Sequence, residues 1–114
     1  MIQPTWRIEY YKNQRGDEVV RKFINSLSPT TKSKVIDTLD LLEKFGIQIG
    51  PPHSKKVIGT PLWELRVLGE SSVRIFYVAK INKTFWLLHG FIKKSQKTPE
   101  YEIKTAVKRL KELG

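Results

Sequence analysis

The side chains of this sequence that could do chemistry are mainly cationic. Lysine and arginine total 21 against 11 aspartates and glutamates, which gives a net charge of +10. Most of the excess falls in residues 54–114, whose net charge is +8. Guanidinium and ammonium groups bind anions, so a nucleic acid is the first partner that the charge predicts. A solubility charge, or a basic face matched to an acidic protein, would give the same excess.

Residue types that are absent or rare exclude several other kinds of site. The chain has no cysteine, which excludes a disulfide scaffold, a thiolate metal site and a cysteine nucleophile, and which fits a cytoplasmic protein. The two histidines, His53 and His89, are too few for a multi-histidine metal site. The best apolar stretch, residues 85–92, is too short to span a membrane, and the N-terminus lacks a signal-peptide pattern. We therefore expect no metal, no cofactor and no membrane partner.

The periodicity of apolar residues predicts the elements that must position these cations. Asp17 and Ser28 are the expected N-caps of two helices, because each precedes a run with helical spacing. Residues 46–61 are rich in glycine and proline and are expected to form an irregular connection. The predicted elements are a strand over 6–11, helices over 17–27 and 28–45, strands over 62–68, 72–80 and 84–93, and a helix that Thr98 and Pro99 begin.

This order, β-α-α-β-β-β-α, predicts a single α+β domain over residues 1–114. We expect the last three strands to form an antiparallel meander, with a helical hairpin packed on one face and all helices on the same side. Alternation along the strands separates Arg66 and Arg74 from the apolar residues of the other face. The two arginines are therefore expected to lie together on an open face of the sheet.

Three ordered segments resemble one family. They are LWELR over residues 62–66, VRIFY over 73–77 and LHGFIKKSQKTP over 88–99, and the last is the longest and most specific. With the element order, they resemble the RelE/HigB toxins of bacterial type II toxin–antitoxin systems (the ParE/RelE superfamily), in the phage-derived HigB-like branch. The resemblance covers essentially the whole chain and implies the RelE-like fold.

The resemblance implies a growth-inhibiting toxin that cleaves messenger RNA in the ribosomal A site without a metal. It also implies a cognate antitoxin, often with a helix-turn-helix domain, which binds the toxin and through which the pair contacts promoter DNA. Such an antitoxin should present an acidic surface to residues 54–114. A ParE-like inhibitor of DNA gyrase that has no catalysis, and a non-toxic basic module that binds nucleic acid, are the alternatives.

Metal-free RNA cleavage needs one group to accept the 2′-hydroxyl proton, cations for the phosphate and a proton donor for the 5′-oxygen. By resemblance, Arg74 would contact the phosphate. Lys93 and Lys94 would follow as a basic pair, and alternation is expected to send them to opposite faces, so that at most one is catalytic. His89 is the remaining catalytic candidate, although a lone histidine in an apolar strand is more often structural.

The other candidates would bind RNA. Glu64 could be a general base or a structural partner of the arginines, and Thr98 has a sufficient role as a helix cap. No pair of residues is an unambiguous acid and base, so we expect weak activity on free RNA. The candidate RNA-binding residues are Arg66, Glu64, Gln96, Tyr101, Lys97, Lys55 and Lys56, with His53 as a further possible contact.

Overall fold

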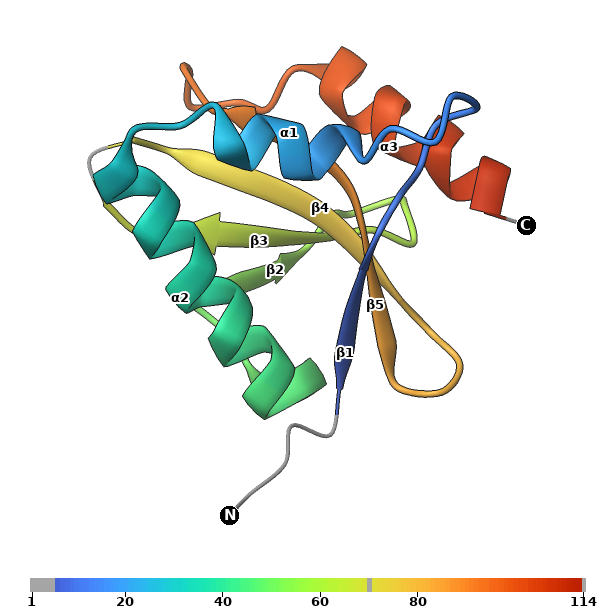
Figure 1. Cartoon of the computed structure of the whole chain (residues 1–114), viewed down its shortest axis with the longest axis horizontal. Coiled ribbons are helices and arrows are strands. Elements are labelled where there is room, and N and C mark those ends of the chain that lie inside the picture. Colours follow the sequence, from blue (N-terminus) through green and yellow to red (C-terminus); the bar gives the residue numbers. More distant parts are fainter. Residues whose placement is uncertain (1–5, 70, 114) are drawn as a thin grey trace.

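The computed structural model describes residues 6–69 and 71–113, which form three helices, one short 3-10 helix and five strands. The predicted α+β fold is confirmed, and Figure 1 shows the sheet crossing beneath α1 and α2. In chain order the elements are β1 (Arg7–Tyr10), α1 (Val19–Asn25), α2 (Pro29–Phe45), η1 (Gly46–Gln48), β2 (Ser54–Lys56), β3 (Trp63–Val67), β4 (Val73–Lys80), β5 (Thr84–Ile92) and α3 (Glu100–Leu113).

The five strands form one sheet in the order β1-β5-β4-β3-β2. The predicted antiparallel meander is confirmed for β3, β4 and β5. The sheet is nevertheless mixed, because β1 pairs with β5 in parallel. Between these two strands the chain crosses over through the helices and the meander, and a crossover returns a strand in the same direction.

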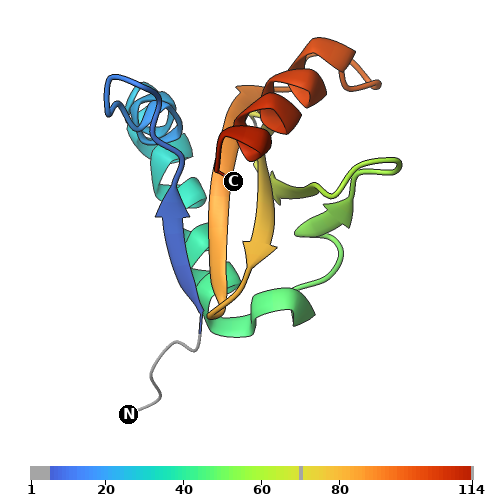
Figure 2. The same ribbon diagram turned by 90° about the vertical axis from the view of Figure 1, so that its right-hand side faces the viewer.

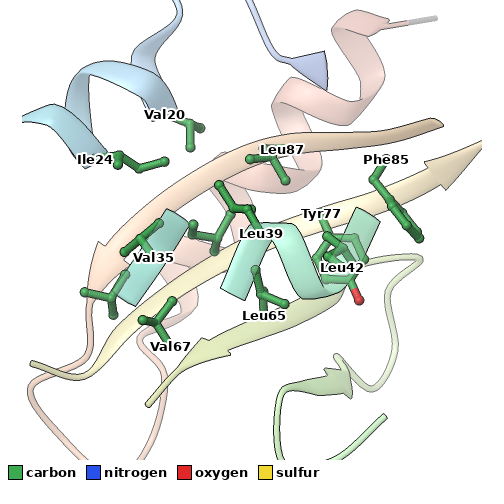
Figure 3. Close-up of a cluster of buried hydrophobic side chains, with 12 residues drawn as sticks. Val20, Ile24, Val35, Leu39, Leu42, Leu65, Val67, Tyr77, Phe85 and Leu87 are labelled. Atoms are coloured by element: carbon green, nitrogen blue, oxygen red, sulfur yellow. The ribbon is translucent and has the colours of Figure 1, made fainter. Parts of the chain in front are cut away.

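The helical hairpin covers one face of the sheet, as predicted. Val20 of α1 and Val35, Leu39 and Leu42 of α2 pack against inward-facing residues of β3, β4 and β5, and Figure 3 shows this cluster of buried side chains. Ser28 caps α2 as expected, since its Oγ accepts a hydrogen bond from the Thr31 amide at 3.3 Å. This cluster fixes the sheet against the hairpin.

The predicted N-cap of α1 was wrong. Glu18, not Asp17, occupies the cap position, and its side chain makes no capping hydrogen bond. The carboxylate of Asp17 instead lies 3.0 Å from Nζ of Lys22, and its amide donates to Oδ1 of Asn13. The turn at 13–17 therefore holds Asp17 just ahead of the helix.

The expectation that all helices share one side of the sheet was also wrong. Helix α3 packs on the opposite face, where Ala106 is fully buried in a second cluster with Phe76, Leu88 and Phe91. Figure 2 shows α3 and the hairpin on different sides of the sheet. Helix α3 is amphipathic and needs an apolar surface, which the α3-facing residues of β4 and β5 supply.

The connection over residues 46–61 is more ordered than its glycines and prolines suggest. It begins with η1 and then forms β2, which pairs antiparallel with β3 in the register Ser54↔Leu65, Lys55↔Glu64 and Lys56↔Trp63. The prediction of an irregular segment was therefore wrong at β2, because a three-residue edge strand gives too short an alternation to detect.

Among the helices of the described residues, none has the length and the apolar composition that spanning a bilayer requires.

Candidate functional site

Arg66 and Arg74 lie directly opposite each other on β3 and β4. Both are on the face that carries Phe76, where α3 covers the neighbouring part of β4 and β5. Nε of Arg66 lies 3.2 Å from Oε1 of Glu64, and Nε of Arg74 lies 3.8 Å from the same oxygen. The predicted pairing of the arginines is confirmed, on a face that α3 partly closes, and a buried carboxylate separates the two like charges.

Arg74 is the more enclosed of the two arginines, with 16% of its side chain exposed. Burial lowers the pKa of its guanidinium, the Glu64 carboxylate opposes that shift, and Arg66 adds to it. Nη1 donates to the carbonyl of Val73 at 3.1 Å, whereas the buried Nε has no hydrogen-bond partner among the described residues. This Nε faces Glu64, so an added oxyanion would be bound by the part of the guanidinium that stays exposed.

A groove at the end of β5, which we call the arginine groove, brings Arg74 together with the basic pair. It is lined by Ser72, Arg74, Lys93, Lys94, Ser95 and Gln96. The amide of Lys93 donates to the carbonyl of Ser72 at 2.8 Å, which holds the chain beside β4. Lys93 and Lys94 both line this groove, because β5 ends at Ile92 and the strand alternation stops there. The expected separation of the two lysines was therefore wrong.

A neighbouring groove, which we call the lysine groove, holds most of the other candidates. Its lining residues are Lys55, Lys56, Val57, Ile58, Glu64, Arg66, Lys93, Lys97, Thr98 and Ile103. Lys93 lines both grooves. Together the two linings hold seven cationic side chains and one carboxylate, so this surface is strongly attractive to a polyanion.

His89 is part of a different cluster, between β5 and α3. Its Nε2 lies 2.7 Å from Oε1 of Glu102, and Nη1 of Arg109 lies 3.2 Å from its Nδ1. Burial lowers the pKa of His89, and Glu102 partly opposes that shift. A neutral imidazole with its proton on Nε2 satisfies both neighbours. These contacts fasten α3 to the sheet, and His89 lines neither groove.

The neighbours of His89 also differ from the expected ones. Phe76 pairs with His89 and Tyr77 with Leu87, so Leu88 is left over as a bulge. The bulge reverses the alternation, and Leu87 packs in the first cluster while Leu88 packs in the second. The expectation that Leu87 shares a face with His89 was therefore wrong.

Nine of the eleven candidate residues line the two grooves, and two do not. Besides His89, the exception is Tyr101, in the first turn of α3, which is 67% exposed and lines neither groove. His53 lies just before β2, and its carbonyl accepts a hydrogen bond from the amide of Arg66. The structure therefore brings the cations together and leaves the aromatic candidate apart.

Sequence reasoning missed several residues around the site. Ser72 and Ser95 line the arginine groove, but neither carries a signal by itself, because serine is common in turns. Glu102 and Arg109 were missed as partners of His89. Their spacing of seven residues, two helical turns, places them on one face of α3 and was a usable signal.

Comparison with known proteins identifies the family. The family model described as "Phage derived protein Gp49-like (DUF891)" matches residues 22–111, from α1 to α3. The chain belongs to this family. Gp49-like proteins are related to the toxins of toxin–antitoxin systems, in agreement with the resemblance of the sequence motifs. The Gp49-like match includes both grooves in full. Among curated proteins, no match is found.

Proposed function

We propose that this Gp49-like protein is the toxin of a type II toxin–antitoxin pair and cleaves messenger RNA on the ribosome without a metal. The arginine groove is the observation that carries the proposal. It places the guanidinium of Arg74, which is enclosed but 16% exposed, beside Lys93 and Lys94. Such a cluster suits a phosphate that gains negative charge as it reacts.

In the proposed reaction the 2′-oxygen attacks the adjacent phosphorus, and the bond from phosphorus to the 5′-oxygen breaks. Arg74 stabilises the charge on the phosphoryl oxygens, because a planar guanidinium can donate two parallel hydrogen bonds to them. Lys93 or Lys94 donates a proton to the leaving 5′-oxygen. The products are a 2′,3′-cyclic phosphate and a 5′-hydroxyl end.

The proton of the 2′-hydroxyl needs an acceptor, and the grooves offer Glu64 as their one carboxylate among the described residues. Glu64 lies between two guanidiniums, so we assign it the positioning of Arg66 and Arg74 rather than proton transfer. A group of the ribosome or a water molecule would then accept this proton, and the ribosome would orient the substrate. We predict weak cleavage of naked RNA by the purified protein. Robust cleavage without ribosomes would contradict this.

The proposed partner is an antitoxin that covers the cationic grooves with an acidic surface, and that carries the helix-turn-helix domain through which the pair would bind promoter DNA. Because the grooves hold seven cations, long-range attraction should speed the association at low salt. We predict that raising the salt from about 0.05 to 0.5 M slows association by about tenfold or more. Stopped-flow mixing of the two proteins measures this, and equal rates at both salts would contradict it.

The test of function is induction of the chain in a bacterium that lacks the antitoxin, with mapping of 5′ ends in messenger RNA. Arg74→Ala should abolish both growth arrest and new in-frame ends. Arg74→Lys keeps the charge but not the planar donor set, and should retain only a small part of the activity. Arg15→Ala is the matched control, because Arg15 is exposed in a turn outside both grooves.

The outcomes separate the competing functions. New ends that depend on Arg74 but not on Arg15 would support the endonuclease. Growth arrest without new ends would contradict RNA cleavage and favour inhibition of gyrase. Normal growth with folded, abundant protein would favour a basic binding module without toxicity.

A further inference from the structure

A third pocket, mainly apolar, lies beside β2 on the face of the sheet that carries the helical hairpin. Its volume is about 440 Å³, within the range of roughly 300–1,000 Å³ that is typical of ligand sites. Ile47, Trp63 and Phe85 are among its walls. Ile47 and Trp63 are 71% and 38% exposed. Large exposed apolar side chains around a pocket are typical of a surface that binds another protein.

The pocket adjoins a free edge of the sheet. Strand β2 is the last in the strand order, and Figure 2 shows it at the outer side of the sheet. The amide of Arg66 donates to the carbonyl of His53, and the amide of Val57 donates to the carbonyl of Leu62. The main-chain polar groups of His53 and Val57 therefore point towards β3. In an antiparallel pair the intervening residues face away. The N–H and C=O of Lys56 therefore point outward, where no other described strand lies.

An added strand at this edge would present its side chains to two different surfaces. Lys56 pairs with Trp63, and Trp63 pairs with Tyr77 of the first core, so a residue opposite Lys56 would face the apolar pocket. The residues on either side of it would face the opposite side, that of the lysine groove, where Lys55 and Arg66 border both this groove and the apolar pocket. The first position favours an apolar side chain and the flanking positions favour acidic ones.

We propose that the β2 edge binds an extended segment of a partner protein in which acidic and apolar residues alternate. Main-chain hydrogen bonds with Lys56 hold the segment along β2, the apolar pocket anchors one side chain, and the lysine groove binds the carboxylates. The antitoxin proposed above is the protein expected to carry this segment. That assignment rests on the proposed function, whereas the binding of the segment can be tested without it.

The polar groups of the pocket favour a peptide over a nucleic-acid base. The hydroxyls of Ser54 and Tyr77 are both buried and lie 2.5 Å apart, so they bond to each other. Nζ of Lys56 lies 5.3 Å from the centre of the Trp63 ring, which places the positive charge at the rim. Lys55, Lys56 and Arg66 also line this pocket and would attract a carboxylate and a phosphate alike. Apart from these cations, the walls offer few partners to the polar edge of a base, and an apolar side chain needs none.

The test uses two labelled seven-residue peptides of identical composition and fluorescence anisotropy with the full-length protein. In one peptide four glutamates alternate with three leucines, and in the other the four glutamates precede the three leucines. We expect the alternating peptide to bind about tenfold more tightly or better, because only its alternation matches the two surfaces. Equal affinity would mean that charge alone attracts the peptides, and would overturn the proposal.

Three variants locate the binding. Trp63→Ser should weaken the alternating peptide about tenfold by removing an aromatic wall, and Lys55→Glu should weaken it similarly by reversing charge. Lys108→Glu makes the same charge reversal at an exposed position on α3 and should change the affinity less than about twofold. An equal effect of Lys55→Glu and Lys108→Glu would overturn the assignment to β2.

Two further outcomes also decide the proposal. Absence of binding by the alternating peptide at millimolar concentration would overturn it, whether or not the protein is a toxin. A seven-nucleotide single-stranded RNA is the competing probe. If this RNA binds, and loses its affinity in Trp63→Ser but not in Arg74→Ala, the pocket takes a base instead of a peptide and the proposal is wrong.

Discussion

The carboxylate of Glu64 should stabilise the fold more than any exposed ion pair of the chain, because it lies between two like charges. Its side chain is 8% exposed, and Oε1 lies 3.8 Å from Nε of Arg74. At that distance the attraction is about 4 kcal/mol with an effective dielectric constant near 20. Part of this offsets the cost of burying both charges. We therefore predict that Glu64→Gln lowers the free energy of unfolding by about 2–4 kcal/mol.

The matched control is Glu18→Gln. Glu18 lies closer to its partner, with Oε1 at 2.7 Å from Nε of Arg21, but the side chains of Arg21 and Glu18 are 52% and 29% exposed. A surface pair of this kind contributes below about 1 kcal/mol. We thus predict that the longer, buried ion pair of Glu64 contributes more to the free energy of unfolding than the shorter, exposed pair of Glu18, because burial rather than distance decides the strength.

Urea unfolding at pH 7, followed by circular dichroism and extrapolated to water, measures both variants. Added salt at about 0.5 M should leave the effect of Glu64→Gln largely intact and remove that of Glu18→Gln, because exposed charges are screened more. The reasoning would be refuted if Glu64→Gln changed stability by less than about 0.5 kcal/mol, or if the two variants lost equal stability.

Two further predictions concern β5. Burial lowers the pKa of His89 below the value of about 6.5 expected in the unfolded chain, despite Glu102 and with the help of Arg109. The unfolded chain then binds the proton more readily, so stability should be full above about pH 6.5 and fall as the pH drops. His89→Gln should flatten this dependence in urea titrations between about pH 7.5 and 5.5, and an unchanged dependence would contradict the assignment. Gly90→Ala should destabilise by about 1–3 kcal/mol, because its Cβ would lie 2.6 Å from the Phe23 ring. Phe23→Leu should recover part of that loss in the double variant, as measured by thermal unfolding, and additive losses would contradict the contact.

The strand faces could be predicted because they depend on local alternation. Val73, Ile75 and Tyr77 pack in the first core and Phe76 in the second, as the period of two requires. The same rule put Arg66 and Arg74 on one face, and the register of β3 and β4 then sets them directly opposite each other. Alternation failed at Leu88, where the bulge inserts one residue that no sequence period reveals.

The side of the sheet that α3 occupies could not be predicted from the sequence. The pattern of α3 shows that it has an apolar face, and both faces of β4 carry apolar residues, so either side was possible. The side chain of Phe76 belongs to the face opposite the hairpin, and burying it requires a second layer. The position of α3 therefore follows from the whole sheet rather than from any local signal.

The second layer also explains why the cations gather at one end of the sheet. Helix α3 covers Phe76, Leu88 and Phe91 but stops short of Glu64 and Arg66, which line the lysine groove instead. The chain reaches α3 from the end of β5 through residues 93–99, so Lys93 and Lys97 must pass this uncovered region. The length of the connection over residues 93–99 and the position of α3 therefore determine together where the grooves lie. A shift of α3 along the sheet would cover Arg66 and Arg74. The contacts of His89 with Glu102 and Arg109 hold the helix where the grooves stay open.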